Sequence, residues 1–115
     1  MEQIKIAIPT VNGRLSPHFG HCEVFTLFEV DSASRKVLRR DEIPAPPHEP
    51  GLLPRWLHEK GVHVIIAGGM GQRAQGLFAE KGIRVVVGAP TDDPKAIVEN
   101  YLNGNLQTGE NICDH

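Results

Sequence analysis

The chain has 115 residues, of which 40% are hydrophobic and 23% charged, and its formal net charge at pH 7 is −2. This length and composition favour one globular domain with its own core and exclude a largely disordered chain. The slightly acidic balance argues against a nucleic-acid-binding protein, which normally presents a basic face.

The first part of the chain is expected to form three strands joined by short loops. The first strand becomes fully apolar, as a strand in a buried sheet does, and Pro9 is expected to end it. The loop that follows contains the turn signal Asn12-Gly13. Aromatic and β-branched residues dominate the second strand, and charged residues protect the third, which favours a sheet edge for it. The three strands are expected at residues 4–8, 23–31 and 36–43.

The second part of the chain is expected to alternate helices and strands. Gly61 and Gly82 are expected to stop the first two helices, while Asp93 caps the third and Pro94 begins it. The helices are expected from residue 52, around residues 74–78 and from residue 94, with apolar strands at 62–67 and 83–87.

The resulting order, β-β-β-α-β-α-β-α, predicts an α/β domain with a five-stranded mixed sheet. Short turns between the first three strands favour an antiparallel meander, and right-handed crossovers through helices make the later strands parallel. No periodic pattern follows Gly104, so we expect one domain over residues 1–104 and a tail over 105–115.

The first residues lack the basic start and apolar run of a signal peptide. No apolar stretch approaches the ~20 residues of a membrane helix. We therefore expect a cytoplasmic protein without a membrane partner. In that reducing compartment, Cys22 and Cys113 are expected to be thiols or ligands rather than a disulfide.

The loop sequence SPHFGHC, at residues 16–22, concentrates residues that bind soft metals. Histidine and cysteine suit zinc, copper, iron or iron–sulfur species, although the spacing matches no closed structural zinc site. His18 is the main candidate. His21 and Cys22 are weaker candidates, because one of two adjacent side chains at a strand entry usually packs inward.

Further candidate ligands lie in two other segments. His48 belongs to a proline-rich loop, which is either an ordinary solvated loop or a rigid support for a ligand. Cys113 and His115 form a Cys-x-His chelate or part of a tail without a role. His58 and His63 are expected to be structural.

A glycine-rich turn precedes the second helix. Residues 69–74, GMGQRA, satisfy the G-x-G-x-x-A pattern of dinucleotide sites, and such a helix start can also bind another anion. No acidic residue ends the next strand, which weakens the dinucleotide interpretation. A tight turn with close helix–sheet packing explains the glycines equally well. The chain has no G-x-S-x-G elbow, and no pair of carboxylates on strands suggests metal-dependent hydrolysis, so turnover is not expected.

Several longer stretches carry a family likeness: SPHFG at 16–20, KGVHVIIAGGMG at 60–71, KGI at 81–83 and TGENICDH at 108–115. Together they closely resemble the dinitrogenase iron–molybdenum cofactor biosynthesis family, which includes NifX, NafY, the C-terminal domain of NifB and the small orange-protein type. The resemblance implies a ribonuclease-H-like fold. It also implies binding of the iron–molybdenum cofactor, its precursors or a related molybdenum, copper or iron sulfide cluster.

On the matching positions, the resemblance makes His18 the first candidate for a cluster contact, and the glycine turn would flank the same end of the sheet. The expected cofactor-binding residues are Ser16, His18, Phe19, Gly20, Gly69, Met70, Gly71 and Arg73. The expected metal ligands are His18, His21, Cys22, His48, Cys113 and His115.

The sequence thus favours a carrier protein for a metal–sulfur cluster. One alternative is an interaction or regulatory module that docks a nitrogenase-related protein or an accessory ATPase. Another is a small enzyme acting on a phosphorylated or nucleotide ligand at the glycine turn.

Overall fold

A computed structural model describes residues 3–16, 22–46 and 51–109. Its elements confirm an α/β domain with a mixed sheet and helices between the later strands. In chain order they are β1 (Gln3–Val11), β2 (Arg14–Leu15), β3 (Val24–Asp31), β4 (Lys36–Pro44), α1 (Leu52–Glu59), β5 (Val64–Ile66), α2 (Gln72–Glu80), β6 (Arg84–Val86) and α3 (Pro94–Leu102).

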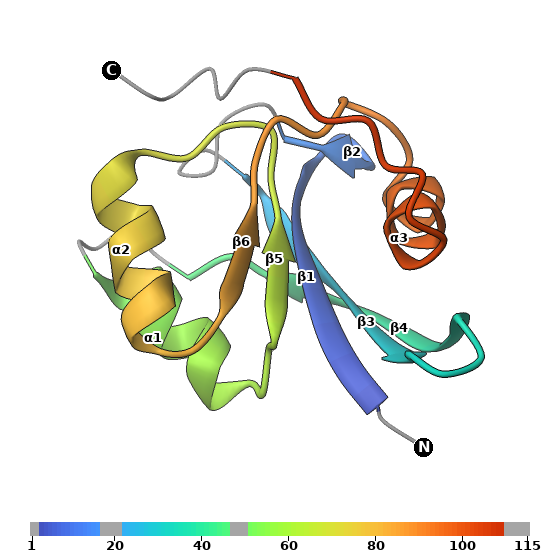
Figure 1. The fold of residues 1–115 in the computed structure, drawn as a ribbon. Coiled ribbons are helices and arrows are strands. Elements are labelled where there is room, and N and C mark those ends of the chain that lie inside the picture. Colours follow the sequence, from blue (N-terminus) through green and yellow to red (C-terminus); the bar gives the residue numbers. More distant parts are fainter. Residues whose placement is uncertain (1–2, 17–21, 47–50, 110–115) are drawn as a thin grey trace.

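The sheet order is β4-β3-β1-β5-β6, with β2 paired to β1 (Figure 1). β1, β3 and β4 form the expected antiparallel meander, and β4 lies at an edge as predicted. β5 runs parallel to β1, and β6 runs parallel to β5, as the helical crossovers predict.

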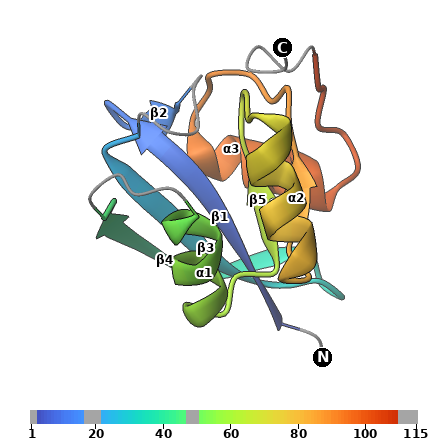
Figure 2. The ribbon, with the colours of Figure 1, turned by 90° about the vertical axis from the view of Figure 1, so that its left-hand side faces the viewer.

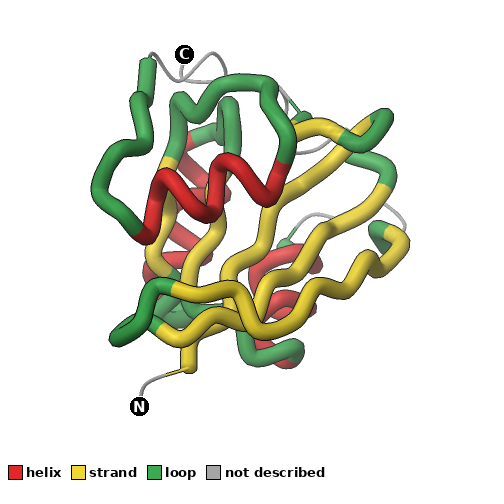
Figure 3. The backbone as a smooth tube through the Cα atoms, turned by 90° about the vertical axis from the view of Figure 1, so that its right-hand side faces the viewer, coloured by secondary structure: helices red, strands yellow, loops and turns green. Residues whose placement is uncertain are grey.

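Helices cover both faces of the sheet. α1 and α2 lie on one face and α3 on the other (Figures 2 and 3). Because successive side chains of a strand point to opposite faces, β1 supplies residues to two cores. Ala7 joins the core under α1 and α2, whereas Ile6 and Ile8 join the core under α3.

The prediction of five strands missed β2. Asn12 and Gly13 have φ values of 53° and 76°, and they form the two-residue turn of a hairpin in which Val11 pairs with Arg14. Positive φ at both central positions is what a type I′ hairpin turn requires. The described part of the sheet therefore has six strands.

The prediction that Pro9 ends the first strand is wrong, because β1 continues to Val11. The Pro9 carbonyl accepts a 2.8 Å hydrogen bond from the Ser16 N–H, on the side of β1 away from β3. The nitrogen of Pro9 faces this same side, and β5 has already ended there at Ile66. A proline is tolerated in a strand where no ladder hydrogen bond needs its missing N–H.

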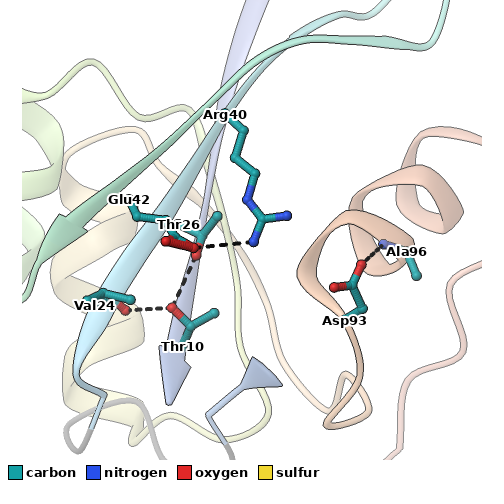
Figure 4. A network of polar contacts seen from close by, with 7 residues as sticks. All are labelled: Thr10, Val24, Thr26, Arg40, Glu42, Asp93 and Ala96. Carbon is teal, nitrogen blue, oxygen red and sulfur yellow. Dashed lines mark hydrogen bonds and ion pairs between the residues drawn. The ribbon is translucent and has the colours of Figure 1, made fainter. Parts of the chain in front are cut away.

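The predicted helix boundaries are confirmed within a few residues. The Asp93 carboxylate accepts a 3.3 Å hydrogen bond from the Ala96 N–H and caps α3, with Pro94 as its first residue (Figure 4). Gly61, with φ of 81°, follows the end of α1 in the left-handed region that favours glycine. None of the helices within the described residues is long and apolar enough to cross a bilayer.

Candidate functional site

One edge of the sheet collects the ends of the chain segments that carry the predicted ligands. β1, β5 and β6 end there, β4 also ends there, and β3 begins there (Figure 1). We call this end of the sheet, where the parallel strands have their carboxyl termini, the carboxyl edge. It is distinct from the lateral edge formed by β4, and it is defined by Ala45, Glu23, Thr10, Gly68 and Gly88. Open α/β sheets bind ligands outside the carboxyl ends of their parallel strands.

The two described residues that bracket the histidine-rich loop lie at the end of β1. Ser16 is buried, with 1% of its surface exposed, and its N–H donates to the Pro9 carbonyl. Glu23, which follows Cys22, donates its N–H to the Thr10 carbonyl at 2.9 Å. The loop therefore leaves and rejoins the sheet at the carboxyl edge. His18, Phe19, Gly20 and His21 lie outside the described residues.

The stems of the other two ligand-bearing segments are also at this edge. The Ala45 N–H donates to the Glu23 carbonyl at 3.0 Å, just before the segment that holds His48. The Gly109 N–H donates to the Gly88 carbonyl at 2.7 Å, just before the segment that holds Cys113 and His115. His48, Cys113 and His115 themselves lie outside the described residues.

Cys22 is half-buried and packs against the core under α1 and α2. Burial raises the pKa of its thiol to about 11, and a backbone hydrogen bond partly opposes this shift. The thiol is therefore protonated at neutral pH. Because metals bind the thiolate, ligation by Cys22 would have to displace this proton.

We expect Cys22, in a Cys113→Ser background, to react with iodoacetamide at pH 8 about tenfold more slowly in the folded protein than in urea. Raising the pKa from 9.0 to about 11 lowers the thiolate fraction, although the more basic thiolate is intrinsically more nucleophilic. The folded-state rate should rise steeply as the pH approaches 11. Equal rates in folded and unfolded protein at pH 8 would contradict the raised pKa.

Two buried threonines join β1 and β3 next to this loop. Thr10 and Thr26 are 1% and 0% exposed, and their Oγ1 atoms lie 3.1 Å apart (Figure 4). The Thr10 hydroxyl donates to the Val24 carbonyl at 3.0 Å, so the Thr26 hydroxyl donates to Thr10. Sequence reasoning missed this pair, because only the strand register brings the two residues together.

The glycine turn between β5 and α2 is mostly buried. Gly68, Gly69 and Met70 are buried, and the Met70 side chain belongs to the core under α1 and α2. The Met70 carbonyl accepts a 2.9 Å hydrogen bond from the Gln75 side-chain amide. Met70 thus fixes the turn through packing, and its side chain does not reach the surface.

The start of α2 is more open than the turn that precedes it. Gly71 is the N-cap, with no hydrogen bond from a capping side chain, and a Cβ built on it would meet nothing within 4 Å. Arg73 is exposed in the first turn of the helix. This combination can place helix-terminal N–H groups and one cation beside an anionic ligand.

The described pockets lie away from these residues. A pocket of about 360 Å³ opens between α1 and α2, and another of about 190 Å³ lies around Lys5 and His63. Neither is lined by a residue of the sequence-predicted site. The Nδ1 atom of His63 accepts a 3.0 Å hydrogen bond from the Lys5 N–H, in agreement with a structural role.

Within residues 3–16, 22–46 and 51–109, no group of three or more His, Cys, Asp or Glu side chains could hold a metal ion. Of the six predicted metal ligands, Cys22 alone falls in these ranges. All six assignments, that of Cys22 included, stay predictions.

Comparisons with known proteins agree with this fold. The family model described as "Dinitrogenase iron-molybdenum cofactor" matches residues 2–104. The uncharacterized protein MJ0580 of Methanocaldococcus jannaschii is 33% identical over 110 residues, which cover 93% of this chain and 92% of the relative.

Two solved structures are similar over most of their length. The crystal structure of PH0822 has a TM-score of 0.84 and 25% identity, and the match covers 91% of this chain and 94% of the other. The apo form of the orange protein from Desulfovibrio gigas has a TM-score of 0.70 and 21% identity, with 93% of each chain covered. The similarity to the orange protein shows a shared fold.

Proposed function

Because the chain belongs to the dinitrogenase iron–molybdenum cofactor family, we propose that it binds and carries a metal–sulfur cluster at the carboxyl edge of its sheet. The cluster is an iron–molybdenum cofactor precursor or a sulfide of molybdenum, copper or iron, and the protein carries it without turnover. Nitrogenase-related proteins or an accessory ATPase in the cytoplasm would supply or receive it.

The observation that supports this proposal is the placement of the three ligand-bearing segments. All three have their described stems at the carboxyl edge, although they are far apart in the sequence. Neighbouring strands lie about 4.8 Å apart, and four spacings separate β4 from β6, so the strand end before Ala45 and the strand end before Gly88, the partner of Gly109, are separated by roughly 19 Å. The stem at Ser16 and Cys22 lies between them.

In this proposal the cluster lies at the middle of the carboxyl edge. β1, which carries the histidine-rich loop, is the direct neighbour of β5, which leads into the glycine turn. In this proposal His18 and His21 contact the cluster, with Ser16, Phe19 and Gly20 in the same loop. The turn residues Gly69, Met70 and Gly71 contribute backbone groups, and Arg73 contributes charge. Cys22, His48, Cys113 and His115 are supporting ligands.

The chemistry of these groups suits an anionic sulfide cluster. Helix-terminal N–H groups and an arginine stabilise negative charge, and imidazole nitrogens bind molybdenum-, copper- and iron-type centres. The raised pKa of Cys22 fits a minor role, because its thiol proton must be displaced before the sulfur can bind a metal.

The test is reconstitution of the purified protein with tetrathiomolybdate, alone and with copper(I), and separately with iron and sulfide. We expect one cluster per chain to survive gel filtration, with a visible absorption band and matching metal content. His18→Ala should lower metal retention by more than about tenfold, since even outer-shell changes cost that much at many metal sites.

The matched control is His58→Ala, because His58 is exposed on α1 and lies outside the proposed site. This variant should retain metal like the wild type. Failure of the wild type to retain any of these metals after gel filtration would refute the proposed function. Equal retention by the two alanine variants would refute the assignment of His18.

A further inference from the structure

Gly88 lies where three backbone segments meet at the carboxyl edge. Its N–H donates to the Gly68 carbonyl at 2.9 Å, and its own carbonyl accepts from the Gly109 N–H at 2.7 Å. A continuous row of hydrogen bonds thus links the segment after α3 to the first residue of the glycine turn. Figure 1 shows this segment running from α3 towards the loop that follows β6.

Gly88 must be glycine for two independent reasons. Its φ is +82°, in the left-handed region that other residues adopt at a cost. In addition, a Cβ on Gly88 would collide with the backbone carbonyl of Gly109, whose atoms are not free to move as a flexible side chain would. The reverse does not hold, since a Cβ on Gly109 would meet the Gly88 carbonyl oxygen at 3.9 Å, an ordinary contact.

The same segment is also held by packing. Leu106 is half-buried and packs against the core under α3, three residues before the Gly109 hydrogen bond. Residues 105–109 are not helical, so neither a helix nor a strand ladder fixes their position. The segment is held at its start by a 2.8 Å hydrogen bond from the Asn105 N–H to the Asn100 carbonyl, then by the packing of Leu106, and at its end by the contact between Gly88 and Gly109.

We propose that Gly88 is a positioning residue that docks residues 105–109 beside the glycine turn, and that this docking strengthens cluster binding. The proposal rests on the proposed function. Because the Gly88 N–H also donates to the Gly68 carbonyl, docking of residues 105–109 restrains the start of the glycine turn, whose backbone groups contact the cluster in the proposed function.

The test compares two substitutions at Gly109 in the full chain. Gly109→Pro removes the N–H that donates to Gly88, whereas Gly109→Ala keeps this N–H and adds a methyl group with ordinary contacts. Hydrogen exchange of peptides covering residues 103–109 reports docking, and the rate of metal loss from reconstituted protein reports binding. Gly88→Ala is a third variant, which introduces backbone strain and a collision with the Gly109 carbonyl. If it fails to fold, the two Gly109 variants are sufficient for the test.

We expect Gly109→Ala to match the wild type in both measurements. Gly109→Pro should exchange faster over residues 103–109 and lose metal about tenfold faster, while thermal unfolding shifts by only a few degrees. Exchange in Gly109→Pro equal to that of the wild type would refute docking through this hydrogen bond.

Faster exchange in Gly109→Pro with a rate of metal loss equal to that of the wild type would refute the positioning role. These outcomes differ from failure of the proposed function, in which the wild type itself retains no metal. The exchange measurement would then still decide whether the segment docks at Gly88.

Discussion

Replacing Met70 by alanine is expected to lower the free energy of unfolding by about 2–5 kcal/mol. The Met70 side chain is 0% exposed and shares a core with Phe78 of α2 and Ile65 of β5. Truncation removes buried apolar surface and leaves a cavity under the glycine turn, which cannot collapse because the strand and the helix on either side hold it. Urea denaturation followed by circular dichroism measures the change.

Met70→Leu separates packing from chemistry. It keeps nearly the same volume without the sulfur and should cost less than about 1.5 kcal/mol. It should also retain a reconstituted cluster, because the Met70 side chain faces the core rather than the carboxyl edge. Leu38→Ala is the surface control, since Leu38 is 52% exposed and should change stability by less than about 0.5 kcal/mol. A cost below about 1 kcal/mol for Met70→Ala would contradict this structural role.

The strands and helices that sequence reasoning located best are those with strong local signals. β3 shows a dense run of aromatic and β-branched residues. The start of α3 is predicted by two residue types, a capping aspartate at Asp93 and a proline at the first helical position, Pro94. The antiparallel and parallel pairings followed from loop lengths and the handedness of crossovers. Local patterns and general topology rules were therefore sufficient for the architecture.

The elements that were missed or misplaced depend on pairing partners. β2 has two residues, too few for a period-2 pattern, although its turn signal Asn12-Gly13 was recognised. The end of β1 was placed at Pro9 because a proline usually stops a ladder. It does not stop this one, because β5 ends beside it. Knowledge of the neighbouring strand is needed for both features.

The candidate site divides in the same way. The ligand-rich loop and the glycine turn are local patterns, and the rule for open α/β sheets places both at one edge. The burial of Met70 was not predicted, because the residue lies in a turn where apolar periodicity gives no signal. The contact between Gly88 and Gly109 joins segments 21 positions apart through backbone atoms. Because such a contact involves backbone atoms alone, the side-chain types in the sequence do not predict it, apart from the presence of the two glycines.

Replacing Thr10 by valine is expected to cost about 1–3 kcal/mol, because it leaves the buried Thr26 hydroxyl without its acceptor. The substitution also removes the donor to the Val24 carbonyl. Thr26→Val should cost less, since Thr10 keeps its hydrogen bond to Val24. Valine matches threonine in shape and favours strands, so the loss reports the hydroxyl rather than the backbone preference. Urea denaturation of both variants measures these costs.

The double variant Thr10→Val/Thr26→Val decides whether the two hydroxyls act as a pair. With both removed, no buried threonine hydroxyl lacks a partner, so the combined cost should be about 1 kcal/mol smaller than the sum of the single costs. Strict additivity would contradict the coupling. The pair lies beside the hydrogen bond from Glu23 to Thr10 that closes the base of the histidine-rich loop. Hydrogen exchange of the Glu23 amide should therefore accelerate most in Thr10→Val, because the end of β1 and the start of β3 then separate more readily.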